Sequence, residues 1–414
     1  FYSFIRSILL LPKIIGLSSI KSYLMKKQLK ISKNNTGLKK IVFLVTSDEK
    51  SGVENMLRLL ADSVDVNKFS IKYVVMMNLS VQNVGNNYDY SLGVKKSIFA
   101  IFNNFHSVIK LYLYLKKFKP DILVSSVYYA DFLSSIIGGV AGVKNIVWGI
   151  HNGVPYSDMK NKQKVAFKLV AFLSHLIPRY IISCSYNISN SHIDNGYDCS
   201  KLKTIQNGVD VNKFKPNNKF RESFRRDLNI SDSTCVLGSC NRFDLNKGHK
   251  DLLVVLASLI SKGHDRKLVL CGRLVNSENT FLMRQINKYN LNDHVILLGE
   301  KQNIHELLNI FDLYVTASYA EAFPLTIIEA MSCGIPVVSY DVGDTQEIIG
   351  DTGWVCDDIG NMQNFEVLVN KFLEESVENI IQRKDLTRRR IVKYWSHENV
   401  VQSYSSLFDT VVNY

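Results

Sequence analysis

Short apolar runs alternate with helical stretches from Lys40 onward, and this alternation limits the chain to one class of fold. The runs are continuously apolar, which is typical of strands buried on both faces of a sheet. A strand followed by a helix, many times over, indicates a parallel sheet covered by helices. The expected strands of a first series are 40–46, 71–77, 121–127, 145–151, 180–185 and 203–207, and those of a second are 234–240, 266–272, 295–300, 313–318, 335–341 and 353–357.

The two series predict two domains of the same kind. At roughly 100–200 residues per domain, 414 residues are enough for two. A polar stretch at 208–220, rich in Asn and Lys, separates the series. The predicted fold class is α/β, with two Rossmann-like domains facing across a cleft where the strands end and ligands bind. The expected parts are a basic, apolar N-terminal extension (1–39), a first domain (40–208), a second domain (209–390) and a C-terminal helix (391–414).

The positive charge of the chain is concentrated at its N-terminal end. Residues 1–40 contain nine Lys and Arg residues and no acidic residue, so the rest of the chain carries only +3 of the net charge of +12. This distribution argues against nucleic acid as a partner. Apolar residues mixed with regular lysines suit a helix on an anionic membrane surface, or a helix packed on the body of the protein. The uncharged runs are too short to span a membrane, and Pro12 and Lys13 interrupt any signal peptide.

The seven cysteines are scattered and include no C-x-x-C pair. Most lie in apolar runs, where a free cysteine behaves as a small hydrophobic residue. This usage predicts a reducing, cytoplasmic compartment and no zinc site.

Two basic residues follow the expected strand at 234–240. Arg242 and Lys247 precede a helix expected to begin near His249, so both lie at a strand end and close to a helix N-terminus. Such a pair could hold a diphosphate through bidentate and point-charge contacts, and it could equally be a solvated loop. No D-x-D pair is present, so a metal-held diphosphate is not indicated, and we expect no cofactor and no metal.

Two further strand ends carry candidate residues. His151 ends the strand at 145–151, where it could be a packed histidine or could bind a substrate hydroxyl. Ser51 and Gly52 follow the first strand and precede a helix that could present N–H groups to an anion. The dinucleotide fingerprint G-x-G-x-x-G and the P-loop pattern are both absent from the chain.

The stretch EAFPLTIIE contains two glutamates in an apolar setting. Pro324 suits the first turn of a helix, which places Glu321 in the preceding loop and Glu329 inside the helix. A ligand hydroxyl or an internal salt bridge could equally satisfy Glu329, because an unpaired buried carboxylate is costly. The helix start, with free N–H groups expected to point at the same cleft, comprises Phe323, Pro324, Leu325 and Thr326.

These elements together resemble the retaining nucleotide-sugar glycosyltransferases of the GT-B fold, in particular the bacterial group 1 type, family 4. The resemblance is carried by EAFPLTIIE with the following AMSCGIPVV, by NRFDLNKG, by TIQNGVDVNKFKP and by DVGDTQEIIGDTGWV. It covers most of residues 40–410 and is closest between 200 and 360. The family often has two glycines where this chain has Ser51 and Gly52.

The resemblance implies a role for each matching residue. Glu321 would contact hydroxyls of the donor sugar, and Glu329 would bind the ribose. Arg242 and Lys247 would hold the donor diphosphate and stabilise the leaving group, a differential effect on the transition state.

Further positions follow from the same resemblance. His151 would lie near the donor sugar, and Ser51 with Gly52 would form the N-terminal glycine loop. The first domain would bind the acceptor and the second the donor. The C-terminal helix would cross back to the first domain.

The resulting hypothesis is a cytoplasmic hexosyltransferase that needs no metal ion. It could bind peripherally to the inner face of the plasma membrane. It would move a sugar from a UDP- or GDP-sugar to a glycan, lipid-linked or surface-polysaccharide acceptor, with retention and by front-face attack. Two other classes use the same two-domain plan: a nonhydrolysing sugar-nucleotide epimerase and a non-catalytic nucleotide-sugar-binding protein. The E-x7-E element argues against the epimerase, and the set of candidate residues argues against the binding protein.

Overall fold

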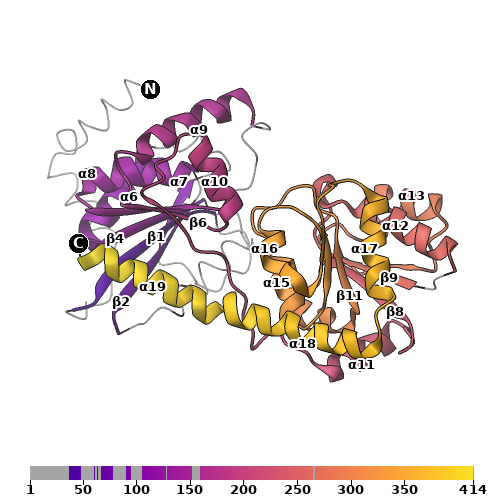
Figure 1. Cartoon of the computed structure of the whole chain (residues 1–414). Coiled ribbons are helices and arrows are strands. Elements are labelled where there is room, and N and C mark those ends of the chain that lie inside the picture. Colours follow the sequence, from indigo (N-terminus) through magenta and orange to yellow (C-terminus); the bar gives the residue numbers. More distant parts are fainter. Residues whose placement is uncertain are drawn as a thin grey trace.

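The computed structural model describes residues 37–47, 60, 63, 67–77, 90–94, 105–126, 128–151, 159–263 and 266–413. Its strands form two parallel sheets, one in each of two domains (Figure 1). The predictions made for residues 1–36, and those for Ser51 and Gly52, lie outside the described residues.

The first sheet has seven strands in the order β3-β2-β1-β4-β5-β6-β7. All neighbouring strands are parallel, as expected for strands buried on both faces. Their bounds are β1 (Lys39–Ser47), β2 (Phe69–Met77), β3 (Tyr90–Val94), β4 (Ile122–Ser126), β5 (Asn145–Ile150), β6 (Tyr180–Ser183) and β7 (Leu202–Thr204).

The second sheet has six strands in the order β10-β9-β8-β11-β12-β13, and these are also parallel. In each sheet the chain starts near the middle, builds outward on one side and then returns to build the other side. The bounds are β8 (Cys235–Cys240), β9 (Arg266–Cys271), β10 (Val295–Leu297), β11 (Leu313–Thr316), β12 (Val337–Tyr340) and β13 (Trp354–Cys356).

Helices cover both faces of the first sheet. On one face Phe167 and Val170 of α9 pack against Trp148 of β5, and on the same side of the sheet α6 packs through Leu111 and Leu115. The indole N–H of Trp148 is satisfied within the core by Ser135 at 3.1 Å. The described helices of this domain are α6 (Phe105–Phe118), α7 (Tyr128–Leu133), the π-helix η1 (Ser134–Gly138), α8 (Gly139–Ala141), α9 (Asn161–Ser174) and α10 (Tyr186–Asp194).

The second domain has the same layered arrangement, with Leu252 and Leu256 of α12 packed on Leu268 and Leu270 of β9. The described helices are α11 (Asn218–Asp227), η3 (Leu245–Lys247), α12 (His249–Ser261), α13 (Thr280–Lys288), α14 (Ile304–Leu307), η4 (Leu308–Ile310), α15 (Leu325–Ser332), α16 (Thr345–Ile349), η5 (Gly350–Thr352), α17 (Met362–Leu373) and α18 (Val377–Tyr394). Across the described ranges, no helix combines the length and the apolarity that crossing a membrane requires.

The C-terminal helix α19 (His397–Asn413) returns to the first domain, as the yellow ribbon of Figure 1 shows. Tyr404 and Phe408 are buried against the face of the first sheet opposite α9, where the rings of Phe408 and Phe43 meet edge to face at 6.2 Å. The chain passes between the domains twice, near Val209 and near Trp395, and the two segments are hydrogen-bonded to each other. The N–H of Val209 donates to the carbonyl of Trp395, and the N–H of His397 donates to the carbonyl of Val209, at 2.9 Å each. The crossing helix expected from the resemblance is thereby confirmed.

Every strand expected from the sequence is present within a few residues of its predicted bounds, and the α/β, two-domain fold class is confirmed. β3 was not predicted. Its sequence, YSLGV, is short and contains a glycine and polar residues, so it lacks the apolar pattern that identifies the other strands. It is a strand because β2 offers it an edge to pair with.

Candidate active site

The predicted site residues lie where strands of the two sheets end. Lys247 follows β8, Glu321 follows β11, and His151 follows β5. β8 and β11 are hydrogen-bonded neighbours although β9 and β10 lie between them in sequence. The strand order reverses there, and open parallel sheets bind their ligands at such a reversal.

Lys247 and Glu321 form an ion pair at this switch point. The Lys247 Nζ lies 2.5 Å from the Glu321 Oε1, and the two side chains are only 17% and 16% exposed. Limited exposure reduces solvent screening, so the pair is stronger than an ordinary surface pair. The pair fixes both side chains beside the carboxyl ends of β8 and β11.

Close backbone packing brings Lys247 to its partner. Asp244 caps η3 by accepting a hydrogen bond from the N–H of Asn246 at 3.0 Å. Gly248 follows with φ of 61°, and a Cβ at this residue would lie 1.9 Å from the carbonyl oxygen of Ala317. The loop after β8 can lie directly against the end of β11 because this residue is a glycine.

Arg242 takes a different position from Lys247. Its side chain is 56% exposed, and its Nη2 lies 3.1 Å from the Asp244 Oδ2. The structure therefore does not bring Arg242 into the ion pair of Lys247 with Glu321. Because an ion pair this exposed contributes little stability, the guanidinium can rotate toward an anion at the end of β8 at low cost.

Glu329 lies in the middle of α15 and is partly buried. Among the residues that the structure describes, none forms a hydrogen bond or an ion pair with its carboxylate, so the internal salt bridge is not formed there. Burial raises the pKa of Glu329 to about 7, and the charge of Lys213 acts in the opposite direction. The ionised carboxylate thus lacks the donors it needs, and hydroxyl groups of a ligand would supply them.

The start of α15 offers a ligand its backbone more than its side chains. The helix begins at Leu325, directly after Pro324, as predicted. The ring of Phe323 is buried, and the side chain of Thr326 is only partly exposed. One N–H expected to be free is engaged, since Leu325 donates to the carbonyl of Phe323 at 2.9 Å.

His151 is buried at the end of β5. Its Nδ1 has no hydrogen-bond partner within the described ranges of the chain. Burial lowers the pKa of His151 to about 4, so the ring is neutral near pH 7. An unpaired nitrogen on a neutral imidazole can donate to or accept from a hydroxyl group, depending on the tautomer.

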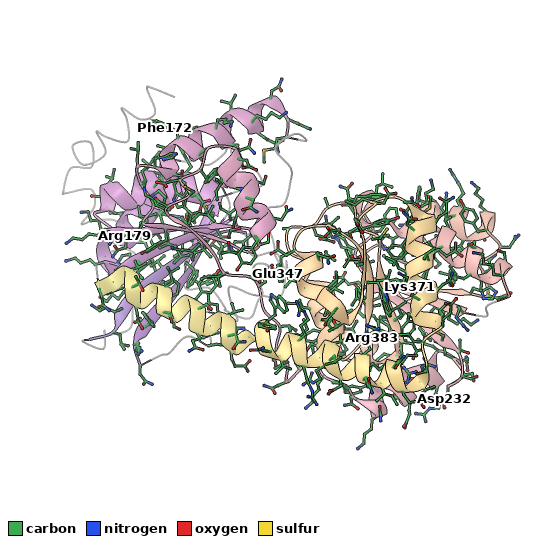
Figure 2. The ribbon with its side chains drawn as sticks, in the orientation of Figure 1. Phe172, Arg179, Asp232, Glu347, Lys371 and Arg383 are labelled. Carbon is green, nitrogen blue, oxygen red and sulfur yellow. The ribbon has the colours of Figure 1, made fainter. Side chains whose placement is uncertain are left out.

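Asp344 joins the two domains and was not predicted. Its Oδ2 accepts a hydrogen bond from the Tyr186 N–H at 2.8 Å, and its Oδ1 accepts one from the Asn187 N–H at 2.9 Å. The side chain of Gln206 donates to Asp344 Oδ2 at 2.7 Å and to Glu347 Oε2 at 2.9 Å. A carboxylate of the second domain thus caps α10 of the first, on the side where Figure 2 labels Glu347.

The loop of Asp344 also touches the loop that carries Glu321. Gly343 has φ of 61°, and a Cβ at this residue would lie 2.9 Å from the carbonyl oxygen of Glu321. The loop that contacts the first domain through Asp344 therefore packs directly on the backbone of Glu321, whose side chain forms the ion pair. A lone aspartate in a polar loop gives no sign of a partner 158 residues away, so sequence reasoning had no means to find it.

In the part of the chain that the structure describes, no group of three or more His, Cys, Asp or Glu side chains is arranged to hold a metal ion.

Comparison with known families gives this fold and site their class. Residues 220–392 match the family described as glycosyl transferases group 1, and residues 94–213 match glycosyltransferase family 4. Among solved structures, that of Anabaena Alr3699/HepE in complex with UDP-glucose has a TM-score of 0.76 and 19% identity over 90% of this chain and 99% of that chain. The chain belongs to the group 1 glycosyltransferases of the GT-B fold, and it is an enzyme of the transferase class.

Three named glycosyltransferases and related enzymes are similar to this chain in sequence, at 22–26% identity. The capsular polysaccharide biosynthesis glycosyltransferase CapM of Staphylococcus aureus is 22% identical over 85% of this chain and 95% of its own length. The UDP-Gal:alpha-D-GlcNAc-diphosphoundecaprenol alpha-1,3-galactosyltransferase of Escherichia coli is 25% identical over 76% of this chain and 82% of its own length. The N-acetyl-alpha-D-glucosaminyl L-malate synthase of Bacillus anthracis is 26% identical over 54% of this chain, and the match spans only 59% of that relative.

Proposed function

We propose that this chain is a retaining hexosyltransferase that moves a sugar from a UDP- or GDP-sugar to a lipid-linked or surface-polysaccharide acceptor, without a metal ion. The observation that carries the proposal is the set of charged groups around α15. There the Lys247–Glu321 ion pair precedes the helix, and Glu329 within it has no partner in the described part of the chain. The set suits a ligand with hydroxyl groups at both ends and anionic charge between them.

Glu329 binds the ribose of the donor in this proposal. Two vicinal hydroxyl groups can donate to one carboxylate, and each hydrogen bond to a charged acceptor contributes roughly 1.5–3 kcal/mol. Those bonds favour the ionised form, so donor binding lowers the pKa that burial has raised in Glu329.

Lys247 and Arg242 hold the diphosphate and stabilise the charge that grows on it as the sugar leaves. The Lys247 ammonium already faces a carboxylate, so the donor competes with Glu321 for it and frees Glu321 for the sugar hydroxyls. Charge stabilisation that increases toward the transition state raises the rate rather than only the affinity. With two cations available, the diphosphate needs no metal ion.

The reaction is front-face transfer, in line with the resemblance to retaining enzymes. The bond from the anomeric carbon to the phosphate oxygen breaks, and the acceptor oxygen bonds to that carbon on the same face. The acceptor proton passes to the departing phosphate oxygen. His151, neutral and unpaired within the described residues, binds a hydroxyl of the sugar and keeps the anomeric carbon oriented.

The acceptor is assigned from its chemistry and from the relatives. CapM is named for capsular polysaccharide biosynthesis, and the Escherichia coli enzyme for an acceptor linked to diphosphoundecaprenol. Nucleotide sugars and such lipid-linked acceptors meet at the inner face of the plasma membrane, which is the proposed location.

The proposal is tested by transfer and donor hydrolysis with a panel of UDP- and GDP-sugars. We expect Glu329→Ala and Lys247→Ala each to reduce turnover by at least about a hundredfold, because each removes charge-assisted contacts. The exposed residues Glu222 and Lys288 provide matched controls as Glu222→Ala and Lys288→Ala. Full activity of both site variants would refute the site.

Two further measurements refine the test. Chelation with EDTA should leave the rate unchanged, and loss of activity that Mg²⁺ restores would refute the metal-independent assignment. NMR of the product should show the anomeric configuration of the donor. Incubation without acceptor should give no new sugar nucleotide, whereas an epimerase would produce one.

A further inference from the structure

Helix α9 presents large apolar side chains to the outside of the first domain. Val165 and Phe172 are 72% and 63% exposed, and Leu176 in the turn after the helix is 66% exposed. Val165 and Phe172 are two helical turns apart, so they lie on one side of the helix. The other side of α9 packs on the first sheet. Figure 2 shows Phe172 on the outer surface of the domain, away from the second domain.

Basic residues surround this apolar stripe. Residues 159–193 contain Lys160, Lys162, Lys164, Lys168 and Arg179 and no Asp or Glu. The side chains of Lys160, Lys168 and Arg179 are exposed, and Arg179 is visible at the surface of this domain in Figure 2. Apolar side chains flanked by lysines and arginines are the composition that binds an anionic bilayer interface.

Exposed apolar residues on α18 serve as a contrast. Val377 and Ile381 are 69% and 62% exposed, about as much as the α9 residues. The sequence beside them carries both signs of charge, with Glu374, Glu375 and Glu378 on one side of Ile381 and Arg383 and Lys384 on the other, and Glu375 is paired with Arg383. The face on α9 differs in having basic residues and no acidic residue between 159 and 193.

We propose that this face of α9, made of Val165, Phe172, Leu176 and the flanking Lys164 and Lys168, docks the enzyme on an anionic lipid bilayer. This proposal depends on the proposed function in one respect, namely that the acceptor is linked to a lipid. The face is apolar enough to enter the interfacial region and basic enough to be attracted to it.

The chain's own N-terminal segment is a poorer occupant of this face. Residues 1–36 contain seven Lys and Arg residues and no acidic residue, so their charge has the same sign as the face. Like charges separate the two, while an anionic bilayer attracts both. The two basic regions would then add to each other's membrane affinity.

Helix α9 runs antiparallel to β5 and β6, because it connects the end of one strand to the start of the other. Its start near Lys160 lies toward the carboxyl end of β5, where His151 stands, and its end with Phe172 and Leu176 lies toward the opposite edge of the sheet. The second domain, which carries the charged groups of the donor site, would remain in water.

The test is co-sedimentation of the full chain with vesicles of phosphatidylcholine and phosphatidylglycerol in a 7:3 ratio, and with phosphatidylcholine alone. We expect binding to the anionic vesicles, weaker binding in high salt, and little binding to the neutral vesicles. Phe172→Ser with Leu176→Ser, and separately Lys164→Glu with Lys168→Glu, should each reduce the partition coefficient by about tenfold or more. Val377→Ser with Ile381→Ser is the matched control and should bind like the wild type.

Donor hydrolysis and transfer to a soluble acceptor fragment separate this proposal from the proposed function. The α9 variants should keep both activities and their melting temperatures. Vesicle binding lost only on deletion of residues 1–36, equal loss in the control variant, or equal binding to neutral vesicles would overturn the proposal. A dimer in wild type that dissociates in the Phe172 variant would also overturn it, by assigning the face to a second copy of the chain.

Discussion

Replacement of Glu329 by glutamine should stabilise the free enzyme and weaken its binding of the donor. Glutamine keeps the shape of the side chain and removes its charge. In the free protein the carboxylate has no hydrogen-bond donor among the described residues, so its ionisation there is a cost to folding. A binding residue is expected to carry such a cost, because its partners arrive with the ligand.

The magnitude follows from the pKa of Glu329, which burial raises from 4.5 to about 7. Below pH 4.5 the carboxyl group is neutral in both the folded and the unfolded chain, and its contribution to stability is fully present. As the pH rises toward 7, the unfolded chain loses its proton first, so this contribution is lost. At 1.36 kcal/mol per pH unit the loss approaches about 3 kcal/mol at pH 8 and is below about 1 kcal/mol at pH 5. Partial exposure of the side chain makes the first value an upper bound.

The assay is urea unfolding of the wild type, Glu329→Gln and the control Glu222→Gln at pH 5 and pH 8. Glu222 is exposed on α11 and should show no difference. For Glu329→Gln we expect a gain in the free energy of unfolding that is larger at pH 8 than at pH 5. The thermal shift produced by a fixed concentration of donor should decrease, as expected for a dissociation constant raised roughly tenfold to a hundredfold.

Two results would refute this reasoning. If Glu329→Gln is less stable than the wild type at pH 8, the carboxylate has a partner in solution and the internal salt bridge is correct after all. If it gains stability but keeps its donor-induced shift, the carboxylate is buried for a reason other than donor binding.

Three other changes probe the architecture of the site. Asp344→Ala should increase the radius of gyration by small-angle scattering and lower kcat/KM by about tenfold, because α10 loses its cap from the other domain; an unchanged scattering curve would contradict this. A double-mutant cycle with Lys247→Ala and Glu321→Ala should give a coupling of about 1 kcal/mol in the free energy of unfolding, and strict additivity would mean that the pair is not formed in solution. Gly248→Ala should lower the free energy of unfolding by about 3 kcal/mol or more, because a Cβ would lie 1.9 Å from a carbonyl oxygen. The control Gly263→Ala, with nothing within 4 Å of the added Cβ, should cost only about 1 kcal/mol of backbone strain. Equal losses of stability by thermal denaturation would show that the crowding at Gly248 is relieved.

The position of the two glutamates of EAFPLTIIE could be predicted because it depends on local geometry. Proline favours a helix start, and the structure begins α15 at Leu325, with Glu321 in the loop and Glu329 inside the helix. The partners of these glutamates could not be predicted. The resemblance implies the same role for Lys247 and Arg242, but only Lys247 meets Glu321, because Gly248 packs the loop of Lys247 on the end of β11.

The short strand β3 marks a limit of the same kind. Its residues have little preference for a strand, and a strand of this sort forms only because a neighbour offers an edge. The longer strands bury both faces, and burial on both faces leaves a continuous apolar run that can be recognised without knowledge of the neighbours.

The sequence by itself determined the alternation of strands and helices, the two sheets, and the strand ends that carry His151, Lys247 and Glu321. These follow from periodicity and turn chemistry, which act over a few residues. Only the tertiary structure decided which charges meet and how the domains touch. Asp344 caps a helix 158 residues away, and the lysines and apolar residues of α9 become one surface only when the helix packs on its sheet. Such contacts depend on how whole helices and strands pack together, and this packing cannot be predicted from the few residues on either side of each contact.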